Sequence, residues 1–143
     1  MNVVKRIERV ALAVKDLAAA RVFFEKLGAR FHPEEVIEDM GIRYLPFDLG
    51  TSRMELLQAT REDSPVARFL ASRGQGVHHV TLEVEDLDQA IEELERADVP
   101  IHARHEYAPG VTFEGCVWRE AFVHPRHSFG VLLHLAEKRP AKG

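Results

Sequence analysis

The sequence predicts an α+β fold made of two similar halves, and three observations lead to this prediction. Residues 7–29 and residues 77–99 align without a gap at an offset of 70. In both segments an alternating apolar strand runs into apolar residues at helical spacing. Each half then closes with two apolar strands joined by a turn, which indicates a β-hairpin. The matched apolar strand positions are Val10, Leu12 and Val14 in the first half and Val80, Leu82 and Val84 in the second.

The bulk properties are those of a water-soluble domain. With 143 residues, the chain has the length of one compact domain. Its formal net charge of −4 comes from 19 basic and 23 acidic side chains. A mildly acidic chain does not indicate a nucleic-acid-binding protein. Cys116 is the single cysteine, so we expect no internal disulfide. We expect no membrane association, since no apolar run approaches the ~20 residues of a membrane helix, and we read no signal peptide. Cytoplasmic localisation is the default expectation.

The first half is predicted to contain one helix and one hairpin. Asp16 stands where a helix N-cap belongs, and Gly28 is placed to end the helix. The predicted core face of this helix carries Leu17, Ala20, Phe24 and Leu27. The hairpin covers residues 43–59, and module one as a whole covers about residues 5–60.

A short connecting helix is predicted between the halves, within about residues 61–75. Asp63 or Ser64 would cap it, Pro65 suits its first turn, and Gly74 would end it.

The second half repeats the pattern of the first over about residues 76–137. Asp86 is the predicted N-cap, and a hairpin is expected over residues 119–137. The predicted helix face carries Leu87, Ala90, Ile91 and Leu94, with Pro100 beyond the helix end. We treat residues 1–143 as a single domain of two modules.

Four polar side chains interrupt the predicted strands at related positions: Arg9, Glu55, His79 and His134. Strand side chains alternate between the two faces, so each of the four points away from the helix of its own half. If the halves form a curved mixed sheet about a pseudo-twofold axis, the four converge in one cup-shaped site. A lone polar residue on such a face is usually just solvated, but four at equivalent positions favour a site. His78, at the start of its strand, has no such assignment.

The chain resembles the vicinal oxygen chelate superfamily (glyoxalases, bleomycin resistance proteins and dioxygenases), and within it most closely the methylmalonyl-CoA epimerase family. The stretches that carry the likeness are VALAVKDLAAARVFFEKLGA, MELLQATREDSPVARFL, GVHHVTLEVEDLDQAIEEL and FVHPRHSFGVLLHL. The resemblance implies tandem βαβββ modules around a metal-holding cup, and a homodimer. It implies an isomerase that acts on a small substrate, such as an acyl-CoA.

The resemblance also implies roles for particular residues. The family's four metal ligands match Arg9, Glu55, His79 and His134, and a further acid/base glutamate before a glycine matches Asp39 or, less well, Glu38. Two of these positions depart from the family, because a histidine is replaced by Arg9 and a glutamate by His134. The chain is therefore expected to use Glu55, His79 and His134 for Zn²⁺, Co²⁺, Ni²⁺ or Fe²⁺, which suit imidazole ligands.

Arg9 opens a metal-free alternative. A guanidinium has no lone pair for a metal, and within ~4 Å it would repel a divalent ion by several kcal/mol at an effective dielectric constant near 20. Glu55 is its expected ion-pair partner. Arg9 is then a candidate to bind a carboxylate or phosphate of the substrate, while His134 and Asp39 act as catalytic acid/base groups. The site with a metal and the site without one both stay open.

The expected reaction is proton abstraction next to a carbonyl or thioester. The alternatives are a glyoxalase-type lyase, a ring-cleaving dioxygenase, which would use two histidines and one carboxylate for iron, and a metal-free protein that only binds a small molecule.

Overall fold

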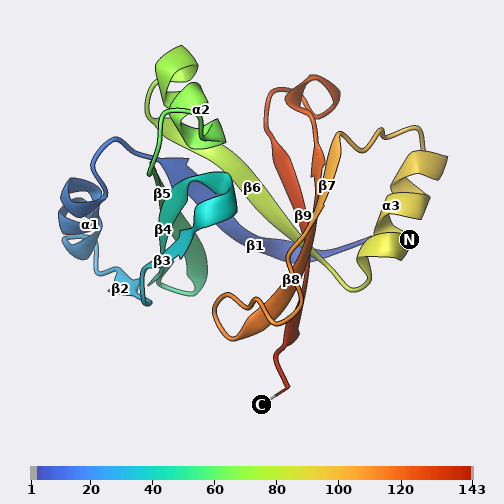
Figure 1. Cartoon of the computed structure of the whole chain (residues 1–143), viewed down its shortest axis with the longest axis horizontal. Coiled ribbons are helices and arrows are strands. Elements are labelled where there is room, and N and C mark those ends of the chain that lie inside the picture. The colour runs from blue at the N-terminus through green and yellow to red at the C-terminus, as the bar shows by residue number, and fades with distance from the viewer. Residues whose placement is uncertain (1–2, 143) are drawn as a thin grey trace. The chain divides into compact units, whose positions relative to one another are not determined.

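The computed structural model describes residues 3–142, which form two compact units (Figure 1). The N-terminal unit is Arg9–His78. The C-terminal unit contains residues 79–142 together with residues 3–8. The first strand, β1 (Val4–Ala13), therefore begins in the C-terminal unit and ends in the N-terminal unit.

In the N-terminal unit, a mixed sheet carries the strand order β2–β4–β5–β1, and β3 also pairs with β4. Strands β2 and β3 are successive pieces of one edge, interrupted by His32, Pro33 and Glu34. The elements after β1 are α1 (Leu17–Glu25), β2 (Arg30–Phe31), β3 (Glu35–Ile37), the 3-10 turn η1 (Glu38–Met40), β4 (Ile42–Leu49), β5 (Ser52–Ala59) and α2 (Pro65–Arg73).

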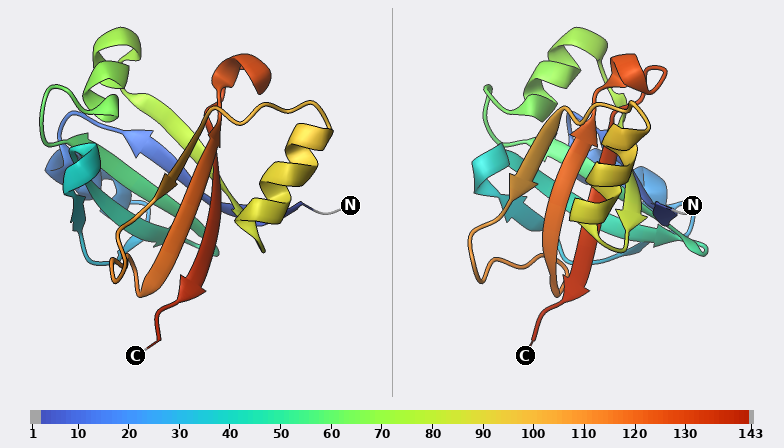
Figure 2. Two further views of the ribbon diagram at one scale, coloured as in Figure 1. Left: turned by 45° about the vertical axis from the view of Figure 1, so that its right-hand side comes forward. Right: turned by 90° about the vertical axis from the view of Figure 1, so that its right-hand side faces the viewer.

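In the C-terminal unit, the order is β6–β9–β8–β7, and α3 packs on β8 and β9 (Figure 2). The elements are β6 (Gly76–Val84), which starts at the end of the N-terminal unit, α3 (Leu87–Arg96), β7 (Ala103–Glu106), β8 (Cys116–Val123), the 3-10 turn η2 (Pro125–His127) and β9 (Leu133–Pro140). Each unit thus follows strand, helix and strands in the predicted order, and the α+β class is confirmed.

The helices begin where the sequence predicts. Asp16 accepts the backbone N–H of Ala19 at 3.1 Å, and Asp86 accepts that of Gln89 at 3.0 Å. Of the two candidate caps for the connecting helix, Ser64 caps α2, through a 3.0 Å hydrogen bond from the Ala67 N–H. The prediction for Leu27 was wrong, because α1 ends at Glu25 and leaves Leu27 56% exposed.

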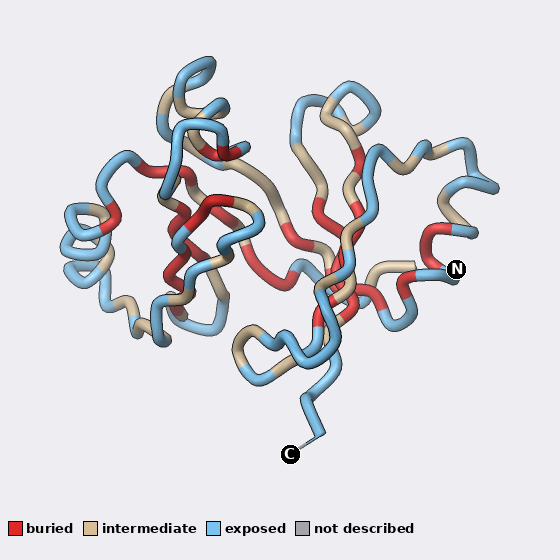
Figure 3. Tube along the Cα trace, viewed as in Figure 1, coloured by how far each residue is buried: buried red, intermediate tan, exposed pale blue. Residues whose placement is uncertain are grey.

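Each unit has its own apolar core between helix and sheet, and the buried stretches lie mainly on the strands (Figure 3). In the N-terminal unit, Leu17 packs with the fully buried Phe47 and Leu56. In the C-terminal unit, Leu87 packs with Ala121 and Leu135, among other residues.

The internal repeat extends to the strand register. In the N-terminal unit β1 and β5 run parallel, with Ala11 opposite Glu55. In the C-terminal unit β6 and β9 run parallel, with Thr81 opposite His134. Ala11 and Thr81 differ by the same 70 residues as the sequence repeat, so Glu55 and His134 occupy equivalent places. Within residues 3–142, none of the helices has the length and apolar character needed to span a bilayer.

Candidate functional site

Three of the four predicted polar positions are buried. Arg9 is 3% exposed and Glu55 7% in the N-terminal unit, and His134 is 8% exposed in the C-terminal unit. His79, at the boundary of the C-terminal unit, is partly buried. Burying an ionisable group is costly unless it is paired, so the partners of these side chains define what each unit can do.

In the N-terminal unit, Arg9 pairs with Glu55, as the metal-free alternative expects. The guanidinium Nη1 lies 3.8 Å from the Oε1 atom of Glu55. Arg9 comes from β1 and Glu55 from the parallel neighbour β5, two residues along in register. The pair places a permanent cation in the interior of this unit, because a guanidinium does not lose its proton in proteins.

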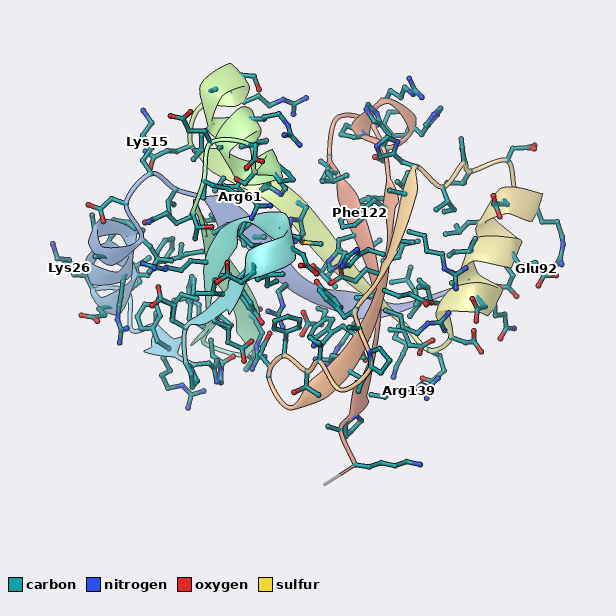
Figure 4. The ribbon with its side chains drawn as sticks, in the orientation of Figure 1. Lys15, Lys26, Arg61, Glu92, Phe122 and Arg139 are labelled. Carbon is teal, nitrogen blue, oxygen red and sulfur yellow. The ribbon has the colours of Figure 1, made fainter. Side chains whose placement is uncertain are left out.

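In the C-terminal unit, His134 lies between a hydroxyl group, a carboxylate and two rings. Its Nδ1 atom is 2.8 Å from the Thr81 hydroxyl oxygen, across the β6–β9 pair. The Phe122 ring is stacked on the imidazole, with centroids 5.0 Å apart, and the His79 ring meets it edge-on at 5.2 Å. Phe122 is labelled on β8 in Figure 4. The imidazole is therefore fixed in orientation by both neighbouring strands.

Glu120 is the carboxylate at this imidazole, and the sequence analysis missed it. It is 6% exposed, and its Oε1 atom lies 3.3 Å from Nε2 of His134. The Tyr107 hydroxyl is 3.3 Å from both carboxylate oxygens, and His105 stands opposite Glu120 in the β7–β8 ladder. Alternation on β8 could have found it, since Ala121 and Val123 face the helix-packed core and Glu120 does not.

Two buried imidazole nitrogen atoms of this unit lack hydrogen bonds. Nε2 of His134 and Nε2 of His105 have no hydrogen-bond partner of good geometry among the described residues. The 3.3 Å contact of His134 with Glu120 is therefore an electrostatic one. Unsatisfied buried polar atoms are rare in folded proteins and mark places where a function is to be sought.

The electrostatics of the cluster favour an ionised Glu120. Burial of the carboxyl group raises its pKa, but the imidazole and charge of His134, the charge of His105 and the Tyr107 hydroxyl together outweigh burial, and the pKa of Glu120 is lowered.

Asp39 lies on η1 of the N-terminal unit and is exposed. Arg61, labelled in Figure 4, holds this turn through the backbone: its Nη1 donates to the Glu38 carbonyl at 2.5 Å and its Nη2 to that of Asp39 at 3.0 Å. Gly41 ends the turn with a φ of 62°, and a Cβ there would lie 2.9 Å from the Arg61 side chain. The backbone at Asp39 is thus fixed, while its side chain faces solvent.

Other polar or aromatic candidates have structural roles. His124 accepts the backbone N–H of Arg126 at 3.1 Å and caps η2. The His78 ring packs edge-on against Phe69 with centroids 5.0 Å apart. Trp118 is buried and donates its indole N–H to the Phe113 carbonyl at 2.8 Å.

The side chains as they stand do not fit a divalent metal ion. Among residues 3–142, no three His, Cys, Asp or Glu side chains are grouped so that they could hold one. Glu55, one of the three expected ligands, is paired with the cation of Arg9. The His134 nitrogens face Thr81 and Glu120. The ligand set Glu55, His79 and His134 stays a prediction.

Comparison with known proteins gives the chain a family. Residues 8–119 match the model of the Glyoxalase/Bleomycin resistance protein/Dioxygenase superfamily. The chain is 33% identical to the mitochondrial methylmalonyl-CoA epimerase of Bos taurus over 92% of this chain and 74% of that protein. It is 32% identical to the ethylmalonyl-CoA/methylmalonyl-CoA epimerase of Cereibacter sphaeroides, over 92% of this chain and 97% of that protein.

A solved structure gives the same result for the fold. A variant of Streptomyces coelicolor methylmalonyl-CoA epimerase, in complex with 2-nitronate-propionyl-CoA, superposes with a TM-score of 0.79. The two sequences are 30% identical, and the match covers 94% of this chain and 97% of that one.

Proposed function

Because this chain belongs to the glyoxalase/bleomycin resistance protein/dioxygenase superfamily and is methylmalonyl-CoA epimerase-like, we propose that it is an acyl-CoA epimerase. Its substrate would be a malonyl-CoA with a small alkyl group at C2, as the names of its relatives suggest. The reaction removes the C2 proton next to the thioester carbonyl and returns a proton to the other side of the carbon.

The observation that carries this proposal is the buried cluster around His134 in the C-terminal unit. Epimerisation needs a group that accepts a proton in a site shielded from water. His134, predicted to be catalytic, sits in such surroundings with Glu120 and Thr81 as its polar neighbours. Imidazole and carboxylate are the side chains that most often move protons in enzymes.

Arg9 and Asp39 complete the proposal from the N-terminal unit. Arg9 is a permanent cation, and we assign it to an anionic oxygen of the substrate, for which the planar guanidinium is well suited. Asp39 is the second acid/base group, and the hold of Arg61 on its backbone supports a fixed position for it. The described side chains do not fit a metal ion, so the proton is moved by side chains alone.

The same proposal includes the wider organisation of the protein. Residues 1–143 act as one domain, with module one at about 5–60, the connecting helix at about 61–75 and module two at about 76–137. The protein works as a homodimer in the cytoplasm.

The first test is exchange of the C2 proton. Methylmalonyl-CoA is incubated with the protein in D₂O, and mass spectrometry follows the uptake of one deuterium. We expect enzyme-dependent exchange together with interconversion of the two C2 epimers. Exchange no faster than in buffer would refute the proposal. Oxygen uptake with iron(II) and a catechol would instead indicate a dioxygenase, and adduct formation between glutathione and a 2-oxoaldehyde would indicate a glyoxalase-type lyase.

Metal dependence is measured on the same protein. Elemental analysis of the wild type, before and after incubation with Zn²⁺, Co²⁺, Ni²⁺ and Fe²⁺, is compared with His79→Ala and His134→Ala. We expect less than stoichiometric metal and exchange that resists EDTA. Stoichiometric metal that disappears in both variants would establish the ligand set Glu55, His79 and His134 instead.

One observation favours a second candidate, a binding protein without turnover. The buried Arg9–Glu55 pair occupies two positions where the family resemblance places metal ligands. If binding of methylmalonyl-CoA is tight, is not altered by EDTA and is accompanied by no proton exchange, this second candidate is correct.

A further inference from the structure

We propose that Glu120, rather than His134, is the group that takes the C2 proton, and that His134 holds the Glu120 carboxylate in place. This inference rests on the proposed function and assigns the two roles within the cluster. All the residues that carry it lie in the C-terminal unit.

Glu120 differs from the other buried glutamates of this unit in its neighbours. The other buried carboxylates of this unit are neutralised by lysine or arginine: Glu8 by Lys138 at 2.8 Å, Glu83 by Arg6 at 2.8 Å, and Glu137 by Arg139 at 3.2 Å and Arg119 at 3.5 Å. A carboxylate that takes up a proton beside a permanent cation leaves that buried cation without its counter-charge, which is costly. Glu120 has the same degree of burial but faces His134, His105 and Tyr107, whose protons can move or be shared.

The hydrogen bond between Thr81 and His134 bears on which ring nitrogen of His134 carries the proton. In the neutral imidazole one ring nitrogen accepts and the other donates. If the Thr81 hydroxyl donates to Nδ1, the Nε2 atom carries the proton and points at the Glu120 carboxylate. In this arrangement the Thr81 bond uses the lone pair of the imidazole, and the Nε2 proton faces Glu120 at 3.3 Å without completing a hydrogen bond. His134 then acts as a donor, and the basic lone pairs belong to Glu120.

The cluster around Glu120 contains unsatisfied hydrogen-bonding groups. Nε2 of His134, which lies 3.3 Å from Glu120, and Nε2 of His105, whose residue stands opposite Glu120 on β7, have no hydrogen-bond partner among the described residues. Catalytic hydrogen bonds are often long or bent without substrate and tighten in the complex. The 3.3 Å contact between His134 Nε2 and Glu120 is therefore one that can shorten into a hydrogen bond.

The step balances without any further reactant. A Glu120 oxygen forms a bond to the C2 proton, the C2–H bond breaks, and its electron pair remains on the substrate as the enolate of the thioester. The neutral carboxylic acid of Glu120 exchanges its proton with solvent. In D₂O the returning proton is then deuterium.

Two variants separate the roles. Glu120→Gln keeps the shape and hydrogen bonding of the side chain but cannot take a proton. His134→Gln keeps an N–H that can donate to Glu120 but is not a base. Exchange of methylmalonyl-CoA should fall by about 100-fold or more in Glu120→Gln and by about tenfold or less in His134→Gln. Calorimetric binding of methylmalonyl-CoA should change less than about threefold in Glu120→Gln.

Glu137→Gln is the matched control, because Glu137 is a glutamate of the same unit with the same 6% exposure. It should leave the exchange rate within about twofold of the wild type. If Glu120→Gln fails to fold, Glu120→Asp is measured in its place. Aspartate keeps the carboxylate but is one methylene shorter, so the carboxylate lies closer to the backbone. Slower exchange with intact binding supports the inference, and an unchanged exchange rate overturns it.

The outcomes distinguish this inference from the proposed function. A wild type that exchanges, with Glu120→Gln equally active, overturns the role of Glu120 alone. If His134→Gln loses exchange while Glu120→Gln retains it, His134 is the base. A wild type without exchange overturns the epimerase proposal and this inference together.

Discussion

In both halves of the chain, the last strand accepts the first backbone N–H of the helix. The Leu17 N–H donates to Gln58 Oε1 at 2.7 Å in the N-terminal unit, and the Leu87 N–H donates to Glu137 Oε2 at 2.8 Å in the C-terminal unit. Leu17 and Leu87 are related by the sequence repeat. The two acceptors are an amide and a carboxylate of nearly the same shape. The halves have thus kept the contact that positions the helix.

Three residues before each acceptor, the same strands differ in chemistry. Glu55 in the N-terminal unit lies beside the fixed cation Arg9, and His134 in the C-terminal unit lies beside Glu120, which can take up a proton. The positions that hold the start of the helix thus have the same role in both units, while positions three residues earlier on the same strands differ in chemistry. One unit holds a permanent charge and the other a pair that can exchange a proton. Four predictions test this contrast.

Loss of the buried cation should have the largest effect. Arg9→Met leaves the Glu55 carboxylate buried without the guanidinium at 3.8 Å, so we expect the free energy of unfolding to fall by roughly 3–5 kcal/mol. Urea denaturation measures it. The double variant Arg9→Met/Glu55→Leu should recover much of that loss, because both charges of the pair are then absent. A double variant as unstable as the sum of the two single variants would contradict the pairing.

Acid should weaken the C-terminal unit through Glu120. Its pKa is lower in the folded than in the unfolded chain, so its ionised form stabilises the fold above the unfolded-state pKa of about 4.3, and that contribution is lost as the pH falls through the folded-state value. Each unit of pKa difference is worth about 1.4 kcal/mol. The stability difference between wild type and Glu120→Gln should therefore shrink between pH 5 and pH 3, a range set by roughly that reference value. A difference independent of pH would show that Glu120 is not ionised.

Loss of the helix contact in the N-terminal unit should cost less. Gln58→Ala removes the acceptor of the Leu17 N–H, and we expect a loss of about 1 kcal/mol in the free energy of unfolding. Thermal denaturation by circular dichroism is sufficient to detect it. Gln58→Glu should keep the stability within about 0.5 kcal/mol of the wild type, since the acceptor atom is retained.

The smallest effect is expected for the equivalent change in the C-terminal unit. Glu137→Gln keeps an acceptor for the Leu87 N–H and removes a charge near the start of α3, which is worth roughly 0.3–1 kcal/mol. It also removes the ion pairs with Arg119 and Arg139, whose side chains are partly exposed and remain solvated. Added salt should reduce the difference from the wild type. If the loss exceeds that of Gln58→Ala, charge rather than hydrogen bonding positions this helix.

The parts of the fold that depend on local chemistry were predictable. Asp16, Asp86 and the Ser64 alternative were identified as caps because a short polar side chain before an apolar helix has few other uses. Alternation along strands placed Arg9 opposite the core and, with the resemblance, suggested its partner Glu55. Leu27 was assigned wrongly, since helix periodicity alone does not show that the helix stops at Glu25.

The site was only partly predictable, because contacts across strands depend on register. Glu120 and His134 are 14 residues apart and meet through the antiparallel pairing of β8 with β9, which no local pattern specifies. Glu120 also lies outside the set of polar positions that match between the two halves. The nearness of His105 and Tyr107 depends likewise on the pairing of β7 with β8.

Arg61 holds the turn before Gly41 through hydrogen bonds to two backbone carbonyl oxygens, those of Glu38 and Asp39. Every amino acid supplies the same carbonyl, so the shape of the turn does not depend on which side chain stands at position 39. Over evolutionary time, that position is free to exchange one acid for another, or for a neutral residue, while the loop keeps its path. A different side chain at position 39 can thus bring new chemistry to this turn while the backbone conformation of residues 38–41 stays the same.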